Sequence, residues 1–176
     1  MILGLDISTT TVGYAFIKDK QIIDMNFINI KKYDIYKEKA LFVLQELDGN
    51  SNISKIDTIF VEDNLSGFSG GKTSQQTIIK LAKFNAILCF LLEDRFDIDV
   101  INVNPLTARK QVFGKARVKG VKAKDFVKRQ VEELYDTDKW CQTTSRGNWD
   151  MRNIDMYDSL VVALYGEYNN LKNGVL

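Results

Sequence analysis

Apolar positions in the first thirty residues form three short runs separated by turn-forming residues. The runs are Ile2–Ser8, Thr11–Ile17 and Gln21–Ile30, with threonine, lysine and aspartate between them. Short strands that follow one another through tight turns pair with their neighbours in the chain. The pattern therefore predicts a three-stranded antiparallel meander.

In the rest of the chain, apolar residues are spaced alternately as in helices and as in strands. The predicted elements are a helix at Tyr36–Leu47, a strand at Ile56–Val61, a helix at Ile78–Leu92, a strand at Asp99–Val103, helical spacing over 126–134, and a last helix at Ile154–Tyr165. Either Ser74 or Thr77 is in position to cap the second helix. No repeat, linker or low-complexity tract interrupts this order. We therefore expect one α/β domain, residues 1–176, with a mixed sheet.

The composition narrows the possible chemistry mainly through what it lacks. The 176 residues are 45% hydrophobic and 27% charged, which is typical of a globular protein, and none is histidine. Ser-His and Cys-His nucleophiles, HEXXH zinc proteases and a histidine general base are thereby excluded. Cys89 and Cys141 alone cannot build a structural zinc site, so we expect two reduced thiols. Carboxylates, lysines, hydroxyls and hard metals remain.

The sequence predicts neither a membrane segment nor a leader peptide. The longest strongly apolar run, Ile87–Leu92, is far too short to span a bilayer. The first residues have no basic region and reach Asp6 at once, unlike a secretory signal. We therefore expect a cytoplasmic protein without a membrane partner.

The formal net charge of +1 conceals a strongly basic stretch from Leu106 to Arg129. Its nine basic residues, opposed only by Asp125, are Arg109, Lys110, Lys115, Arg117, Lys119, Lys122, Lys124, Lys128 and Arg129. A run of like charge is often only a solvated helix face. Here Gly114 and Gly120 interrupt the stretch, and its charges would surround any helix drawn through it. A polyanion-binding loop is the better interpretation.

Acidic residues recur at the ends of the predicted elements. Asp6 lies near the end of the first strand, Glu62 ends the fourth, and Asp155 and Asp158 share one face of the last helix. Any one of these acids is explained equally well by a turn or a helix cap. Together they predict a carboxylate cluster at one sheet edge, and such a cluster needs cations. Oxygen ligands alone favour Mg²⁺, with Mn²⁺ as a substitute, as two ions about 4 Å apart.

The segments around these acids resemble the RuvC family of Holliday-junction resolvases. They are most similar to the divergent branch found in phages of Gram-positive bacteria, lactococcal phages among them. The resembling segments are Gly4–Thr10 (GLDISTT), Gly13–Ala15, Ile59–Asp63 (IFVED), Lys80–Leu88 and Ile154–Leu164 (IDMYDSLVVAL). Each is weak alone, but their order and spacing cover nearly the whole chain.

The resemblance implies an RNase H-like fold of the retroviral integrase superfamily, with a five-stranded mixed sheet flanked by helices. It implies that Asp6, Glu62, Asp155 and Asp158 are catalytic metal ligands. The implied activity is that of a crossover-junction endodeoxyribonuclease: a homodimer cutting Holliday junctions and other branched DNA, including flaps and forks. Hydrolysis by two metal ions would leave 5′-phosphate and 3′-hydroxyl ends, and a phage-encoded member would work in the host bacterial cytoplasm.

The resemblance is incomplete in the segment after Glu62. Bacterial members have an aromatic residue three positions after the glutamate, where this chain has Leu65. Phe68 is the candidate replacement, so strict junction or sequence selectivity does not follow from the resemblance. We expect DNA contacts from the residues Phe68, Lys72, Lys110, Lys115, Arg117, Lys119, Lys122 and Lys124.

Three other interpretations remain open. Gly4–Thr10 also resembles the first phosphate loop of actin-like ATP-using kinases, but those enzymes are about twice as long and carry a second such loop. Ser66–Thr73 (SGFSGGKT) approaches a P-loop, with serine in place of the first glycine. A non-catalytic branched-DNA-binding protein would need only the basic stretch. The complete set of four acids favours the nuclease, for which we expect no ATP requirement.

The helix at Ile78–Leu92 is apolar around much of its circumference, more than one sheet face requires. Its spare face, around Phe84, Leu88 and Leu91, is our candidate for the interface of a two-fold dimer. A monomer in which another helix covers that face is the alternative.

Overall fold

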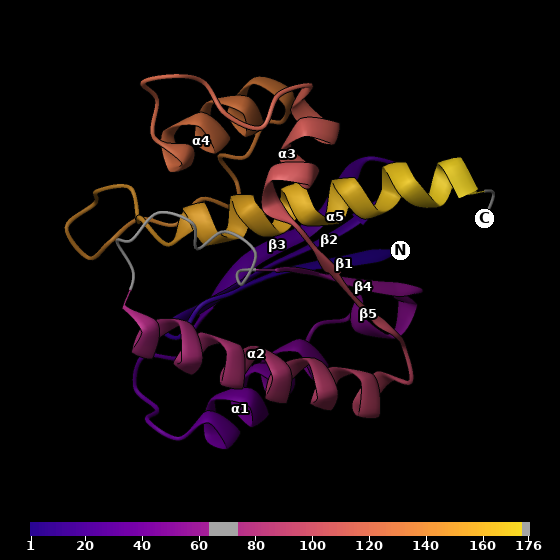
Figure 1. Ribbon diagram of the computed structural model, residues 1–176, viewed down its shortest axis with the longest axis vertical. Helices are drawn as coiled ribbons and strands as arrows, with labels where there is room; N and C mark the ends of the chain where they lie inside the picture. Colours follow the sequence, from indigo (N-terminus) through magenta and orange to yellow (C-terminus); the bar gives the residue numbers. More distant parts are fainter. Residues whose placement is uncertain (64–73, 174–176) are drawn as a thin grey trace.

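The computed structural model describes residues 1–63 and 74–173 of the chain. Five strands form one sheet in the order β3-β2-β1-β4-β5 (Figure 1). The strands are β1 (Ile2–Ile7), β2 (Thr11–Lys18), β3 (Gln21–Asn29), β4 (Thr58–Glu62) and β5 (Val100–Val103). The predicted mixed sheet is thus confirmed, with β1 at its centre.

The pairing of the strands confirms the predicted meander. β1 pairs antiparallel with β2, placing Asp6 opposite Gly13, and β2 pairs antiparallel with β3. β4 pairs parallel with β1, with Leu5 beside Val61, and β5 adds in parallel to β4. The carboxyl ends of β1 and β4 therefore lie together at one edge of the sheet.

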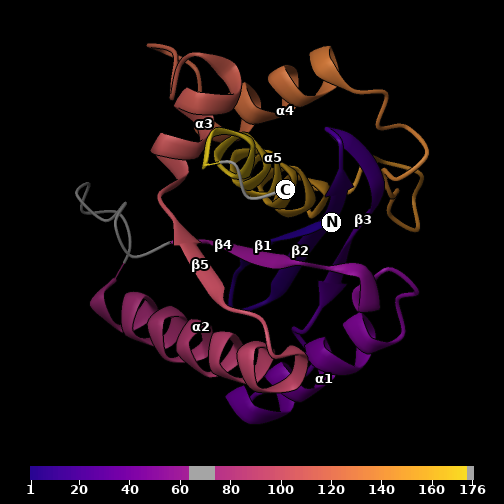
Figure 2. The same ribbon diagram turned by 90° about the vertical axis from the view of Figure 1, so that its right-hand side faces the viewer.

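Helices cover both faces of the sheet (Figures 1 and 2). They are α1 (Tyr36–Asp48), α2 (Gln75–Phe96), α3 (Pro105–Phe113), α4 (Ala123–Leu134) and α5 (Asn153–Asn173). α1 and α2 pack on one face, whereas α5 crosses the other face with α3 and α4 outside it. The central strands β1, β2 and β4 are buried on both sides, as expected for strands covered by helices, whereas the edge strands β3 and β5 are partly exposed.

Strand alternation divides the buried residues between the two faces. Leu3, Leu5 and Ile7 belong to the core formed with α1 and α2. Ile2 and Phe60 belong to the core beneath α5. Because successive side chains of a strand point to opposite faces, Asp6 and Glu62 lie on the α5 face.

The start of the basic stretch differs from the prediction, because residues 105–113 form α3 instead of a loop. The side chain of Asn104 accepts hydrogen bonds from the backbone N–H groups of Leu106 (2.9 Å) and Thr107 (3.2 Å). Pro105 occupies the first turn, where its missing N–H costs nothing. The helix ends at Gly114, whose φ of 74° suits glycine. The basic loop is therefore confined to residues 114–122.

The second predicted helix is longer than its apolar pattern indicated. α2 begins after Ser74, whose hydroxyl accepts a hydrogen bond from the N–H of Thr77, so Ser74 is the cap. Phe84 and Leu88 are fully buried against the sheet and α1, so the suggestion that they form a free dimer face is wrong. The large apolar side chains that remain exposed on this helix are those of Ile79 and Phe90.

In the described part of the chain, no helix is long and apolar enough to cross a membrane. Both cysteines, Cys89 and Cys141, are free thiols, as expected.

Candidate active site

Two of the four candidate carboxylates end neighbouring parallel strands. The pair Leu5–Val61 is the last in register between β1 and β4, and Asp6 and Glu62 come directly after it. Both side chains are on the α5 face of the sheet and both are buried. The predicted meeting of these two acids at one sheet edge thus follows from the observed strand order.

The other two carboxylates come from α5, which lies directly on the sheet backbone. A Cβ added to Gly13 would be 2.0 Å from the carbonyl oxygen of Asp155, and one added to Gly4 would be 2.3 Å from that of Ser159. Because these contacts are so close, a side chain at either glycine would force α5 and the sheet apart. Because Gly13 is the strand partner of Asp6, this approach brings the start of α5 over the end of β1.

The acids on α5 and β4 affect one another's ionisation. Burial, followed by the charge of Asp158, raises the pKa of Glu62 to about 8. Burial also raises the pKa of Asp155 to about 6, and the charge of Asp158 adds to this shift. The pKa of Asp158 is raised by burial, although Arg109 opposes the shift. These shifts are the expected result of holding like charges together away from water.

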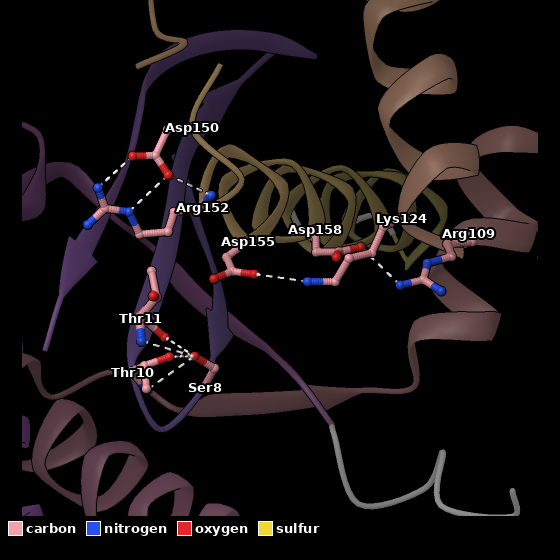
Figure 3. A network of polar contacts seen from close by, with 9 residues as sticks. All are labelled: Ser8, Thr10, Thr11, Arg109, Lys124, Asp150, Arg152, Asp155 and Asp158. Atoms are coloured by element: carbon pink, nitrogen blue, oxygen red, sulfur yellow. Dashed lines mark hydrogen bonds and ion pairs between the residues drawn. The ribbon is translucent and has the colours of Figure 1, made fainter. Parts of the chain in front are cut away.

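Two basic side chains reach the acids from the outer helices (Figure 3). Nη2 of Arg109, on α3, donates a hydrogen bond to Oδ1 of Asp158 at 2.9 Å, and both side chains are nearly buried. Nζ of Lys124, at the start of α4, lies 3.9 Å from Oδ1 of Asp155. The sequence predicts a DNA contact for Lys124 and places Arg109 only within the basic stretch. The capping signal of Asn104-Pro105 would have placed Arg109 on a helix, but not against Asp158.

The two acids on α5 are ion-paired. Within residues 1–63 and 74–173, no three acidic side chains are placed to bind one ion together. Arg109 and Lys124 instead neutralise part of the charge on Asp158 and Asp155. The arrangement places buried carboxylates next to basic side chains of α3 and α4.

The remaining basic candidates lie on the outer side of the α5 layer. The exposed side chains are those of Lys110 on α3, Lys115, Arg117 and Lys119 in the loop, and Lys122 at the start of α4. Phe68 and Lys72, together with Leu65 and the glycine-rich Ser66–Thr73, lie outside the described residues.

Comparison with known proteins identifies the fold. No known protein family profile matches the chain, and no curated protein matches it in sequence. Thermus thermophilus RuvC matches with a TM-score of 0.64 at 12% identity, covering 98% of this chain and 96% of that one. T. thermophilus RuvC in complex with Holliday junction substrate matches with a TM-score of 0.65 at 11% identity, covering 97% of this chain and 95% of that one. The yeast mitochondrial Holliday junction resolvase matches with a TM-score of 0.58 at 16% identity, covering 99% of this chain and 84% of that one. The predicted RNase H-like fold is confirmed, in its RuvC-like form.

Proposed function

We propose that this protein is a divalent-metal-dependent endonuclease that cuts branched DNA, four-way junctions foremost. The observation that carries the proposal is that Asp6 and Glu62 end neighbouring strands beneath the start of α5, where the charge of Asp158 acts on Glu62. The RuvC-like fold supports it, since one of the matched structures is of a RuvC protein bound to a Holliday junction substrate.

The residues at the site fit a hard divalent cation. They provide carboxylate oxygens, which Mg²⁺ and Mn²⁺ prefer. Burial is the main cause of the raised pKa values of Glu62 and Asp155, and a bound cation would favour the charged form of both carboxyls. We assign Asp6, Glu62, Asp155 and Asp158 as the ligands of two ions. When bound, the ions would neutralise charge on the scissile phosphate, activate the attacking water and stabilise the leaving oxygen.

The basic residues of the chain have two roles in this proposal. Arg109 and Lys124 are close enough to the acids to balance their charge before the metal binds and to face the phosphate afterwards. The exposed residues of the loop 114–122 would bind phosphates flanking the cut. Such contacts depend on charge alone, so they hold any sequence and weaken with salt.

We further propose that the working unit is a two-fold homodimer with one site in each subunit. A four-way junction has approximate two-fold symmetry, and its resolution requires nicks in two opposed strands, which an isologous dimer matches. Exposed apolar side chains of α1 and α2 gather beside a groove that they share. The residues lining this groove are Lys37, Leu41, Ala86, Ile87, Phe90 and Leu91. This groove replaces Phe84 and Leu88 as the candidate interface.

The first experiment is incubation of the purified protein with a labelled four-way junction, with and without Mg²⁺ and without ATP. Paired nicks that require the metal, and that disappear in Asp158→Asn, are the expected result. Binding without cutting in Mg²⁺ or Mn²⁺ would favour the non-catalytic alternative, and a need for ATP would favour a nucleotide-binding protein. Flaps, forks and plain duplex in parallel identify the preferred substrate.

The dimer is tested with mixed subunits, wild type and Asp6→Asn. Separate sites predict a single nick in a supercoiled cruciform instead of a linear product. Light scattering that finds only monomer, free and bound to a junction, would contradict the dimer.

A further inference from the structure

A polar pocket lies near Asp155, on the side away from α3 and α4. Its volume is about 420 Å³, and its lining residues are Thr10, Thr11, Asn29, Lys31 and Arg152. Two of these side chains are cationic and three carry hydroxyl or amide groups. This is the set of donors that binds phosphate and sugar oxygens.

Arg152 is held in place by contacts that leave part of it open to solvent. Its Nε and Nη2 donate to the carboxylate of Asp150 at 3.0 and 2.5 Å, and Asp150 is buried. Its guanidinium also lies over the ring of Phe27, 4.7 Å from the centroid. The side chain nevertheless stays 39% exposed. An arginine oriented in advance loses little conformational entropy when it binds an anion.

The turn on the other side of the pocket is also fixed. The hydroxyl of Ser8 donates to the carbonyl of Thr11 at 2.8 Å and accepts from its N–H at 3.0 Å. The buried amine of Lys39 donates to the carbonyl of Thr9. Thr10 and Lys31 remain exposed at the rim. The pocket is therefore bounded by a hydrogen-bonded turn and an ion-paired arginine.

The pocket and the outer helices flank the acids from different sides. In Figure 3, Arg152 and the Ser8–Thr11 turn lie on one side of Asp155, and Lys124 and Arg109 lie on the other. Arg152 is close enough to Asp155 for its charge to oppose the upward shift of that carboxyl's pKa. A DNA strand bound across the acids would thus have Arg152 on one side of them and Lys124 and Arg109 on the other.

We propose that this pocket binds the sugar–phosphate backbone of the cleaved DNA strand on one side of the scissile phosphate, while the loop 114–122 binds it on the other. The inference rests on the proposed nuclease function and adds to it a second strand-binding subsite. Lys31 and Arg152 contact phosphate oxygens, and the hydroxyl of Thr10 adds a neutral donor. Because these residues do not touch the reacting atoms, they position the strand.

The first test measures junction binding without divalent metal, so that cutting does not interfere. Lys31→Gln and Arg152→Gln should each weaken binding about five- to tenfold near 0.1 M salt, and each should reduce the log–log salt slope by about 0.7 to 0.9. Lys32→Gln is the matched control, because Nζ of Lys32 lies over the rings of Tyr33 and Phe42, at 4.9 and 4.6 Å. It should bind as the wild type does.

The second test locates the contact along the strand. Single neutral methylphosphonates are placed on either side of the cleaved bond, and their effect on affinity is compared between the wild type and each variant. Some phosphates should weaken DNA binding by the wild type when they are neutralised, but not binding by Lys31→Gln. These phosphates should all lie on one side of the cut. Phosphates whose neutralisation affects binding by the wild type but not by the Lys115→Gln and Lys119→Gln variants should lie on the other side.

The outcomes separate this inference from the proposed function. Normal binding and slope in Lys31→Gln and Arg152→Gln, with weakened binding in Lys115→Gln/Lys119→Gln, would overturn the subsite and leave the nuclease intact. A wild type that binds no branched DNA would overturn both. Arg152→Gln removes the partner of Asp150 and so needs an unfolding control, whereas Lys31 is exposed and its variant tests the pocket without that complication.

Discussion

Gly13 lies directly beneath the carbonyl oxygen of Asp155, and a Cβ at this glycine would be 2.0 Å from that oxygen. The contact joins the strand partner of Asp6 to the first turn of α5. Helix and sheet are thus in backbone contact at the point where the carboxylates meet. The geometry of the site depends on the absence of a side chain at Gly13.

Gly13→Ala should therefore damage the site without changing any charged residue. The methyl group must push α5 from the sheet, and overpacking of this kind costs about 1–3 kcal/mol. We expect a lower free energy of unfolding by urea denaturation and a larger proportional loss of cleavage. Gly49→Ala is the control, since a Cβ there meets only ordinary contacts at 3.5 Å. Full activity in Gly13→Ala would show that the spacing of α5 is unimportant.

Each acid of the cluster should be necessary for cutting but not for binding. The variants Asp6→Asn, Glu62→Gln, Asp155→Asn and Asp158→Asn remove a proposed metal ligand and leave the phosphate-binding cations in place. Cleavage should be abolished or severely reduced while junction affinity is kept, and Asp138→Asn, an exposed acid, serves as control. Wild-type cleavage should also fall as pH drops, because protons compete with the metal. Near-normal cleavage in any one variant would remove that residue from the ligand set.

Arg109→Gln should destabilise the protein most strongly without divalent metal. The substitution leaves the carboxyl of Asp158 without the buried guanidinium that now pairs with it, at a cost of up to about 3 kcal/mol. Urea unfolding measures the loss, and Mg²⁺ should restore more stability to this variant than to the wild type. Adding Asp158→Asn should recover part of the loss in metal-free buffer. Equal stability of Arg109→Gln and wild type without metal would mean that the pair contributes nothing.

The contribution of Asp150 to stability should depend on pH. Hydrogen bonds from Arg152 lower the pKa of Asp150 in the folded protein. A carboxyl with a lowered folded pKa stabilises the fold above its unfolded pKa of about 3.9 and loses this contribution as pH falls through the folded value. The difference in unfolding free energy between wild type and Asp150→Asn should therefore be largest near neutral pH and shrink below about pH 4. A constant difference across that range would contradict this assignment.

Neutralising the basic loop should weaken binding to all branched DNAs alike. The variant combines Lys115→Gln, Arg117→Gln, Lys119→Gln and Lys122→Gln, all at exposed positions. Each lost phosphate contact should reduce the log–log salt slope by about 0.9 on duplex arms. Fluorescence anisotropy over a range of salt concentrations measures the slope. An unchanged slope would place the main binding surface elsewhere on the protein.

The local pattern of the sequence was sufficient for the sheet and for the positions of the acids. Alternating apolar residues reported the strands, their short connections implied the meander, and Asp6 and Glu62 stood at strand ends where β1 and β4 meet. The start of α3 was also present in the sequence, as the cap Asn104 followed by Pro105, but the dense positive charge of the stretch obscured it. The spacing of apolar residues predicts these elements correctly because it shows which face of a helix or strand is buried.

Only the tertiary structure decided which residues meet. The apolar surface of α2 was evident from the sequence, but α1 and the sheet cover Phe84 and Leu88 and leave Phe90 exposed. Among nine similar basic residues, Arg109 alone donates a hydrogen bond to Asp158, 49 positions away in the chain. Nothing in the spacing of charges distinguishes such a partner from a solvated lysine. That choice depends on how the helices pack on the sheet, because distance and burial determine whether a charge pairs with another or with water.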